Sequence, residues 1–214
     1  MKLKVCGMRN PENIKDLIKV SPDYVGFIFY DRSPRHVGDD FDENIFNDFP
    51  SNIKKVGVFV NAPLALIVEK VKKYKLDLVQ LHGEELPDFC KNLQSKGVNV
   101  IKAFSVDNNF IFSQLNNYKQ YCDYFLFDAK GEQKGGNGIL FDWKILQKYD
   151  NDKPLFLAGG ISLDTIKEAL EIKNVKIHAI DINSKFELSP GMKDIEAISS
   201  LKKLMSNENE PILI

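Results

Sequence analysis

The segment Pro154-Leu155-Phe156-Leu157-Ala158-Gly159-Gly160-Ile161-Ser162 contains a short apolar run followed by two glycines and a serine. A short run rich in Leu and Phe, with turn residues after it, is typical of a β-strand. Ser162-Leu163-Asp164 then favours the start of a helix. The segment predicts a strand that leads directly into a helix, the repeating unit of an α/β fold.

The same unit recurs over nearly the whole chain. Eight short runs rich in Val, Ile, Leu or Phe predict strands at residues 3–8, 24–30, 55–60, 76–82, 98–104, 124–129, 154–160 and 179–183. Clear helical patterns cover residues 65–75, 85–96 and 193–205, and weaker ones cover residues 44–49, 108–118 and 143–149. The first helix is predicted to begin at Asn10-Pro11, with asparagine as the N-cap and proline at the first helical position.

Alternation of strands and helices indicates a parallel sheet, and eight units indicate that the sheet closes into a (β/α)₈ barrel. The 214 residues give about 27 residues per unit, which is a compact version of this fold. We therefore expect a single α/β domain, a TIM barrel over residues 1–205, with a short polar C-terminal tail at residues 206–214. An open, doubly wound parallel sheet is the alternative.

Composition and charge restrict the class of protein. Hydrophobic residues make up 43% and charged residues 28% of the chain, as in soluble globular proteins. The net charge of −1 provides no general attraction for nucleic acid or an acidic membrane surface, so we expect neither as a partner. No apolar run is long enough for a membrane span, and the start of the chain lacks the apolar region of a signal peptide. The wide spacing of Cys6, Cys90 and Cys122 favours free thiols in a reducing, cytoplasmic setting.

Polar side chains lie near the ends of several predicted strands. Successive strand residues point to opposite faces, so Gln80 and His82 share one face of their run. Lys4 likewise shares a face with Cys6, and Asp181 shares one with Asn183. Asp128 is the polar residue at the end of the otherwise apolar sixth strand. Because active sites of such barrels lie at the carboxyl ends of the strands, we expect these groups to converge at one mouth. Taken singly, Gln80, Lys4 and Asp181 are better explained as core polar groups, with Lys4 and Asp181 as a structural ion pair.

Two predicted strand ends have the composition of a phosphate site. Gly159 and Gly160 precede a helix, and glycines let the backbone approach an anion next to the N–H groups of a helix start. Asn183 and Ser184 follow the eighth strand and offer further donors. The loops after strands seven and eight are the usual phosphate site in this fold. A third glycine-rich segment, residues 130–138, has the composition of a loop that closes over substrate, or of a plain surface connection.

Several short motifs follow one another in order along the chain. They are Lys4-Val5-Cys6-Gly7-Met8, Ser33-Pro34-Arg35, Val56-Gly57-Val58-Phe59-Val60-Asn61, Val79-Gln80-Leu81-His82-Gly83, Phe127-Asp128, Gly135-Gly136-Asn137-Gly138 with Phe141-Asp142-Trp143, Ala158-Gly159-Gly160, and Asp181-Ile182-Asn183-Ser184 with Ser189-Pro190-Gly191-Met192-Lys193-Asp194. Together they resemble the phosphoribosylanthranilate isomerase family of tryptophan biosynthesis. That family usually has threonine in place of Asn137 and often glycine in place of Lys185, so the contacts of these two positions stay open.

The resemblance implies a barrel enzyme that needs neither a metal nor an organic cofactor and acts on a small phosphorylated substrate. The family's reaction is an Amadori rearrangement of N-(5-phosphoribosyl)anthranilate to 1-(2-carboxyphenylamino)-1-deoxyribulose 5-phosphate, an aldose-to-ketose isomerisation. An acid opens the sugar ring to a Schiff base, and a base then removes the proton on C2. By resemblance, Asp128 is the general acid and Cys6 is the general base.

Both roles require unusual protonation states. Free aspartate is mostly ionised at neutral pH and a free thiol is mostly protonated, so the site must favour the acid form of Asp128 and the thiolate of Cys6. The helix start at Pro11, or a nearby cation, would lower the pKa of Cys6. Arg35 offers a bidentate fork for the anthranilate carboxylate. The other expected contacts are Gln80, His82, Gly136 and Asp181 with the substrate, and Gly159, Gly160, Asn183 and Ser184 with its phosphate.

Several alternatives stay open at this point. Cys6 as a buried structural thiol, Arg35 as a surface arginine and His82 as a core histidine are the simpler interpretations of single residues. A metal-dependent epimerase would need ligands such as Cys6, His36 and His82, whose spacing is not that of a zinc site. Another phosphosugar isomerase, or a barrel that binds a phosphorylated metabolite without catalysis, also fits the fold. We expect a monomer, because the sequence shows no apolar surface stripe.

Overall fold

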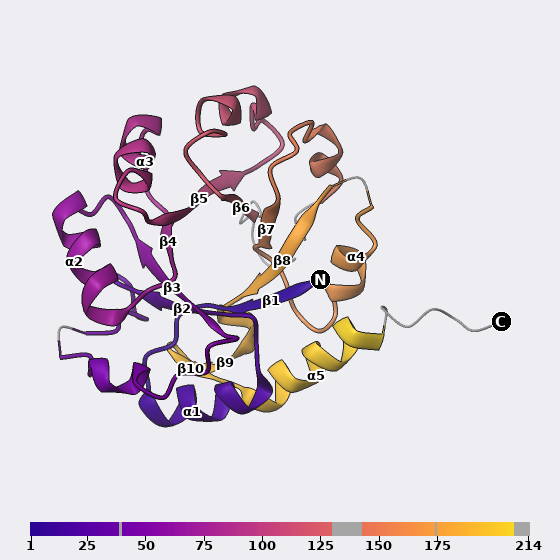
Figure 1. Cartoon of the computed structure of the whole chain (residues 1–214). Coiled ribbons are helices and arrows are strands. Elements are labelled where there is room, and N and C mark those ends of the chain that lie inside the picture. The colour runs from indigo at the N-terminus through magenta and orange to yellow at the C-terminus, as the bar shows by residue number, and fades with distance from the viewer. Residues whose placement is uncertain (39, 130–142, 174, 208–214) are drawn as a thin grey trace.

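A closed barrel of eight parallel strands forms the centre of the computed structural model (Figure 1). The structure describes residues 1–38, 40–129, 143–173 and 175–207. The barrel strands are β1 Lys2–Val5, β2 Tyr24–Ile28, β3 Lys54–Phe59, β4 Leu78–Leu81, β5 Asn99–Val106, β6 Tyr124–Ala129, β7 Leu155–Ala158 and β8 Ile177–Ile182. They lie in chain order, and β8 closes the barrel by pairing with β1. Each overlaps one of the eight predicted strands, so the barrel is confirmed and the open sheet is excluded.

Helices surround the barrel and connect its strands (Figure 1). The α-helices are α1 Pro11–Val20, α2 Leu64–Tyr74, α3 Pro87–Gln94, α4 Ile166–Leu170 and α5 Ile195–Asn207. At the start of α1, the side-chain oxygen of Asn10 accepts a hydrogen bond of 3.0 Å from the backbone N–H of Asn13. The predicted N-cap is therefore confirmed. No helix in the described ranges has the length and apolar character needed to cross a membrane.

Three predicted helices are 3₁₀ turns instead. They are η1 Glu43–Phe46, η2 Phe112–Asn117 and η3 Trp143–Lys148, where the sequence predicted α-helices at residues 44–49, 108–118 and 143–149. Each turn buries one to three apolar side chains, among them Phe46, Leu115 and Leu146. In η1 and η2, Asn and Ser compete for backbone hydrogen bonds and weaken an α-helix, so a short 3₁₀ turn is enough to place their anchors.

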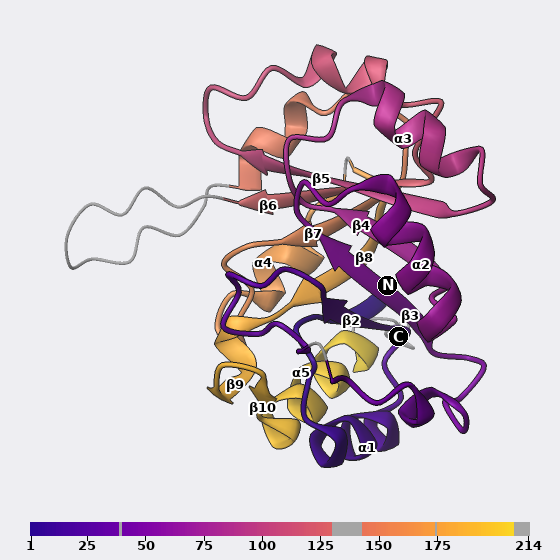
Figure 2. The ribbon, with the colours of Figure 1, turned by 90° about the vertical axis from the view of Figure 1, so that its left-hand side faces the viewer.

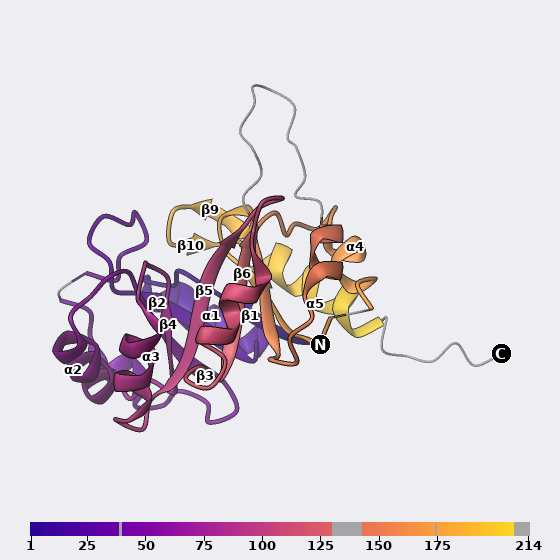
Figure 3. The ribbon, with the colours of Figure 1, turned by 90° about the horizontal axis from the view of Figure 1, so that it is seen from above.

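The chain after β8 contains three elements that the sequence did not predict. They are η4 Ser184–Phe186, β9 Glu187–Ser189 and β10 Met192–Lys193, and β9 pairs with β10 in an antiparallel hairpin. Helix α5 accordingly begins two residues later than expected, and it includes residues 206 and 207 of the predicted tail. The rest of that tail, residues 208–214, lies outside the described ranges. Figures 2 and 3 show the hairpin at the end of the barrel towards which β5 and β6 point.

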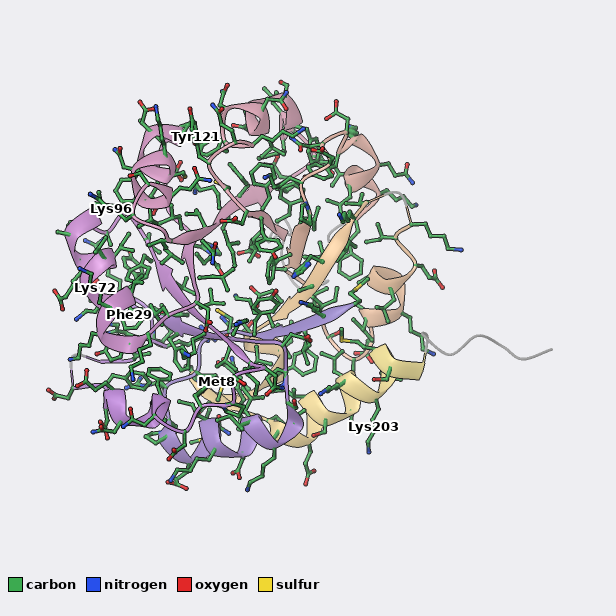
Figure 4. All side chains as sticks on the ribbon, viewed as in Figure 1. Met8, Phe29, Lys72, Lys96, Tyr121 and Lys203 are labelled. Carbon is green, nitrogen blue, oxygen red and sulfur yellow. The ribbon has the colours of Figure 1, made fainter. Side chains whose placement is uncertain are left out.

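The core has two parts, one inside the barrel and one between the strands and the helices (Figure 4). The side chains inside the barrel are Tyr24, Val56, Leu78, Ile101, Ala103, Leu126, Phe156, Ala158 and Ala179. They extend from Tyr24 at the start of β2 to Ala158 at the end of β7. Gln80 on β4, Asp128 on β6 and Asp181 on β8 are polar and lie one residue before the ends of their strands. Strand alternation therefore delivers these polar groups to the carboxyl end of the barrel.

Candidate active site

A cavity of about 320 Å³ lies at the carboxyl ends of the strands. It is lined by every predicted site residue that the structure describes: Cys6, Arg35, Gln80, His82, Asp128, Gly159, Gly160, Asp181, Asn183 and Ser184. Gly136 and the predicted loop at residues 130–138 lie outside the described residues. The polar groups thus converge on one cavity, as expected for a barrel enzyme, while their individual roles stay predictions.

Cys6 follows β1 and is buried at the wall of the cavity. Gly26 on β2 leaves room for it, because a Cβ at position 26 would lie 2.9 Å from the sulfur. Burial raises the pKa of the Cys6 thiol, and the positive charges of Lys4 and Lys193 offset this only in part. The expectation of a lowered pKa is therefore wrong for the free enzyme.

Lys4 and Asp181 form an ion pair inside the barrel, as the sequence suggested. Lys4 Nζ lies 2.7 Å from Asp181 Oδ2, and their side chains are 0% and 7% exposed. Burial raises the pKa of Asp181, and the neighbouring Lys4 ammonium opposes this effect. The second oxygen, Asp181 Oδ1, is buried and has no hydrogen-bond partner in the described part of the chain. The pair is both structural and part of the cavity wall.

On the opposite side, Gln80, His82 and Asp128 form a line of polar contacts. Gln80 Nε2 lies 2.7 Å from His82 Nδ1, and His82 Nε2 lies 3.4 Å from Asp128 Oδ2. Gln80 is almost completely buried, whereas the side chains of His82 and Asp128 are 33% and 38% exposed. The predicted acid is thus in contact with an imidazole and with solvent. His82 is a cavity residue rather than the core histidine of the simpler interpretation.

Arg35 belongs to a cluster of charges that the sequence predicted only in part. Its guanidinium donates hydrogen bonds from Nε and Nη2 to the carboxylate of Glu187, the shortest of them 2.6 Å long. Lys193 Nζ lies 2.6 Å from the same carboxylate and 2.7 Å from Asn183 Oδ1. Burial alone would raise the pKa of Glu187, but the hydrogen bonds from Arg35 and Lys193 lower it. Arg35 therefore lines the cavity in an orientation fixed by Glu187, and it is not a free surface arginine.

The sequence contains a feature that could have identified Glu187 and Lys193 as neighbours. Pro190-Gly191 is a turn dipeptide, and a hairpin around it places Glu187 opposite Lys193. The N–H of Gly191 also donates to Glu187 Oε1 at 3.0 Å. Opposite charges at cross-strand positions favour the hairpin. The turn would have predicted the hairpin, but its contact with Arg35, 152 residues away in sequence, depends on the barrel.

The predicted phosphate-binding groups lie together at the ends of β7 and β8. Gly159 and Gly160 have φ values of 77° and 71°, which glycine adopts without strain. Helix α4 begins at Ile166 and not directly after Ser162. A turn held by Thr165 separates it from the glycines, since Thr165 Oγ1 donates to Gly160 O at 2.8 Å and accepts from Ser162 N at 2.9 Å. Lys185, where the family often has glycine, also lines the cavity.

An apolar wall completes the cavity. It consists of Ile28 and Val58 with Cys6, and Tyr30 packs against this group. The sequence did not identify these residues, because an apolar strand end has the same pattern whether it faces a cavity or the core. The other two histidines do not line the cavity: His36 bridges to Ile28, and His178 Nε2 lies 2.7 Å from the hydroxyl of Tyr24. The zinc ligands considered from the sequence are therefore not brought together.

Comparison with known proteins agrees with this site. The family model described as N-(5'-phosphoribosyl)anthranilate isomerase matches residues 3–203. The N-(5'-phosphoribosyl)anthranilate isomerase of Parabacteroides distasonis is 42% identical over 201 residues, which cover 94% of this chain and 91% of the relative.

Two solved structures show the same fold. A phosphoribosyl anthranilate isomerase in complex with reduced 1-(o-carboxyphenylamino)-1-deoxyribulose 5-phosphate is 30% identical, with a TM-score of 0.84 over 97% of this chain and 99% of that one. A monomeric form of the dimeric enzyme from Thermotoga maritima is 28% identical, with a TM-score of 0.78 over 95% and 97% of the two chains.

These similarities extend over almost the entire chain and include the strands that carry the cavity residues. They favour an enzyme over a barrel that only binds a phosphorylated metabolite. The chain belongs to the N-(5'-phosphoribosyl)anthranilate isomerase family and is an isomerase of tryptophan biosynthesis.

Proposed function

We propose that the chain performs an Amadori rearrangement of N-(5-phosphoribosyl)anthranilate with Asp128 as general acid and Cys6 as general base. The observation that carries this proposal is that a thiol on β1 and a carboxyl on β6 line one cavity. The rearrangement needs an acid for the ring oxygen and a base for C2, and the two groups supply one of each. The bound compound of the relative with 30% identity is a reduced form of the expected product.

The acid step begins with a proton on Asp128. Transfer of that proton to the ring oxygen breaks the bond between this oxygen and C1, and the anthranilate nitrogen stabilises C1 as a Schiff base. Asp128 is left ionised beside His82, whose Nε2 lies 3.4 Å from the carboxylate. Because both side chains are about one-third exposed, water can return a proton to Asp128 after each turnover.

The base step requires the Cys6 thiolate. This anion removes the C2 proton, and the electron pair of the C–H bond forms the C1–C2 double bond. The electrons of the C1–N double bond return to nitrogen, which gives the enolamine. C1 then gains a proton and the C2 hydroxyl loses one, which gives the ketone. Lys4 and Lys193 favour the thiolate by their charge, although burial raises the pKa of Cys6. The active fraction of the enzyme therefore increases with pH on the base side.

The remaining groups bind the substrate. Glu187 occupies Nε and Nη2 of Arg35, so Nη1 is the donor we assign to the anthranilate carboxylate. Ile28, Val58 and Tyr30 form the apolar wall for the aromatic ring. We assign the phosphate to Gly159, Gly160, Asn183 and Ser184, and the sugar hydroxyls to Gln80, His82 and Asp181. Gly136 is proposed by family resemblance alone, since it lies outside the described residues.

Loss of substrate fluorescence tests these roles. Asp128→Asn and Cys6→Ser should each reduce kcat by about 10³-fold, the scale of general acid–base catalysis, with an unchanged circular dichroism spectrum. Near-normal turnover in either folded variant would remove that residue from its role. Arg35→Ala should raise KM more than it lowers kcat, and an unchanged KM would contradict the carboxylate contact.

We also propose that the enzyme works in the cytoplasm as a monomer. Its three cysteines are free, as a reducing compartment requires. Its exposed large apolar residues, among them Leu86, Ile111 and Leu188, lie on different connections. Sedimentation equilibrium tests the monomer: a mass near 24.4 kDa is expected, and twice that mass would indicate a dimer like that of the Thermotoga maritima relative.

A further inference from the structure

The line of contacts on β4 contains an unsatisfied group. Gln80 is 1% exposed, and its amide nitrogen lies 2.7 Å from His82 Nδ1, yet its amide oxygen is buried without a partner among the described residues. A second buried acceptor without a partner, Asp181 Oδ1, lines the same cavity. Buried polar atoms are almost always hydrogen-bonded, so two orphaned acceptors in one cavity need an explanation.

A half-turn of the Gln80 amide changes which atom faces His82 without changing its shape. With the nitrogen facing the ring, Nδ1 must be bare, and Nε2 carries the only ring proton, directed at ionised Asp128. With the oxygen facing the ring, Nδ1 carries a proton and donates it to the amide. The contact between Nε2 and Asp128 then needs a proton of its own, so this arrangement holds one proton more. It also replaces an orphaned acceptor by an NH₂ group, which donates to water in the cavity.

We propose that Gln80 is a positioning residue for the acid: its carbonyl accepts a hydrogen bond from Nδ1–H of His82 and thereby keeps a transferable proton between His82 Nε2 and Asp128. This inference rests on the proposed role of Asp128. In the acid step that proton moves to the ring oxygen, and the proton on Nδ1 stays in place. Nε2 and the carboxylate are then two acceptors facing each other, which favours return of a proton from water.

The charged groups around His82 and Asp128 are themselves paired, so we consider the hydrogen bond between Gln80 and His82 as the factor that sets the protonation state. From β8 and β1 the pair faces Asp181, its partner Lys4, and Cys6. Behind β4, Lys102 Nζ donates to the carbonyls of Leu81 and Gly83 at 3.3 and 2.7 Å and lies 3.2 Å from Glu85 Oε2. The two lysines are each matched by a carboxylate. We therefore infer that the orientation of the amide selects the protonation state.

The tautomer of His82 can be measured without substrate. In protein labelled with ¹⁵N-histidine, the signals of His82 are those that disappear in His82→Asn, while those of His36 and His178 stay. At neutral pH, Nδ1 of His82 should have the shift of a protonated ring nitrogen. A bare, pyridine-type Nδ1 would overturn the proposal. This result is independent of whether Asp128 is the acid, which Asp128→Asn tests by turnover.

Two variants of Gln80 test the functional consequence. Gln80→Glu keeps only acceptor atoms and should shift the alkaline limb of the kcat/KM profile to higher pH. Gln80→Met keeps the shape without an acceptor, so this limb should move to lower pH and kcat at neutral pH should fall about tenfold, as for loss of one hydrogen bond to a charged group. Gln114→Met, at an exposed glutamine of η2, is the control and should leave the profile unchanged.

Other outcomes of these experiments contradict the proposal. The alkaline limb of the kcat/KM profile could lie at the same pH in Gln80→Glu and the wild type. Alternatively, KM could rise in both variants while the pH profile stays unchanged. Either result would mean that Gln80 is only a substrate contact. If either variant fails to fold, the tautomer in the wild-type protein decides alone.

Discussion

The two sides of the cavity differ in packing and in contact with water. On the side of β1 and β8, Lys4, Glu187 and Lys193 have side chains that are 0%, 4% and 0% exposed and lie in ion pairs of 2.6 to 2.7 Å. On the side of β4 and β6, His82 and Asp128 are 33% and 38% exposed and 3.4 Å apart. The base side is thus dry and fixed, whereas the acid side is wet. A base in a dry site needs neighbouring cations to ionise, and an acid near water regains its proton easily.

Replacing one polar side chain on each side should test this comparison most clearly. Lys4→Met leaves Asp181 buried without its partner, which should lower the free energy of unfolding by about 3–5 kcal/mol. His82→Asn, at a partly exposed position, should lower it by about 1 kcal/mol or less. Urea denaturation followed by circular dichroism measures both values. Equal losses in the two variants would show that the two sides are not packed differently.

The Glu187 carboxylate should have a smaller effect, concentrated on substrate binding. Glu187→Gln keeps the shape but weakens the hold on Arg35 and Lys193, so Arg35 samples more conformations. We expect KM to rise about tenfold, with a smaller change in kcat, since a hydrogen bond to a charged group contributes about 1.5–3 kcal/mol. Steady-state kinetics at fixed pH measures this. A change confined to kcat would contradict the positioning of Arg35 by Glu187.

Acid should weaken the dry side through protonation of Glu187. The pKa of Glu187 is lowered below its usual value of 4.5, with Arg35 and Lys193 outweighing burial. A carboxylate with a lowered pKa contributes stability above the pKa it has in the unfolded chain and loses this contribution as pH falls through the folded value. The unfolding free energy of the wild type should therefore decrease below about pH 4.5. The unfolding free energy of Glu187→Gln should decrease less over the same pH range. Identical slopes of unfolding free energy against pH in the two proteins would exclude a contribution from Glu187.

A local backbone effect is expected at Gly160. Its φ is 71°, and no atom lies within 4 Å of the position where a Cβ would be. Gly160→Ala therefore meets no clash, but the left-handed conformation should cost about 1–2 kcal/mol. Thermal unfolding with and without inorganic phosphate measures both stability and binding. A loss of more than this amount would mean that the glycine has a packing role that the structure does not show.

The sequence predicted the barrel and most of the cavity for a simple reason. Strand alternation has a period of two, so the pattern alone assigns Gln80 with His82, and Asp181 with Asn183, to one face of their strands. The rule that barrel strands carry the site at their carboxyl ends then brings these faces together. The site residues whose placement follows from the local strand pattern could therefore be predicted from the sequence.

The rest depended on contacts between distant segments. Burial decides the pKa of Cys6, and the burial of one thiol cannot be inferred from its neighbours in sequence. Glu187 reaches Arg35 only because the hairpin after β8 lies beside the loop after β2. The 3₁₀ turns differ from the predicted helices because tertiary packing needs only a few anchors there. Long-range packing, not local propensity, set each of these features.

The central claim is that the thiol of Cys6 acts as the base and the carboxyl of Asp128 as the acid in one cavity. The pH dependence of kcat/KM for the wild type, Cys6→Ser and Asp128→Asn tests it most directly. The wild-type profile should be bell-shaped. The residual activity of Asp128→Asn should only rise with pH, and that of Cys6→Ser should only fall. A bell-shaped profile that persists in either folded variant would contradict the assignment.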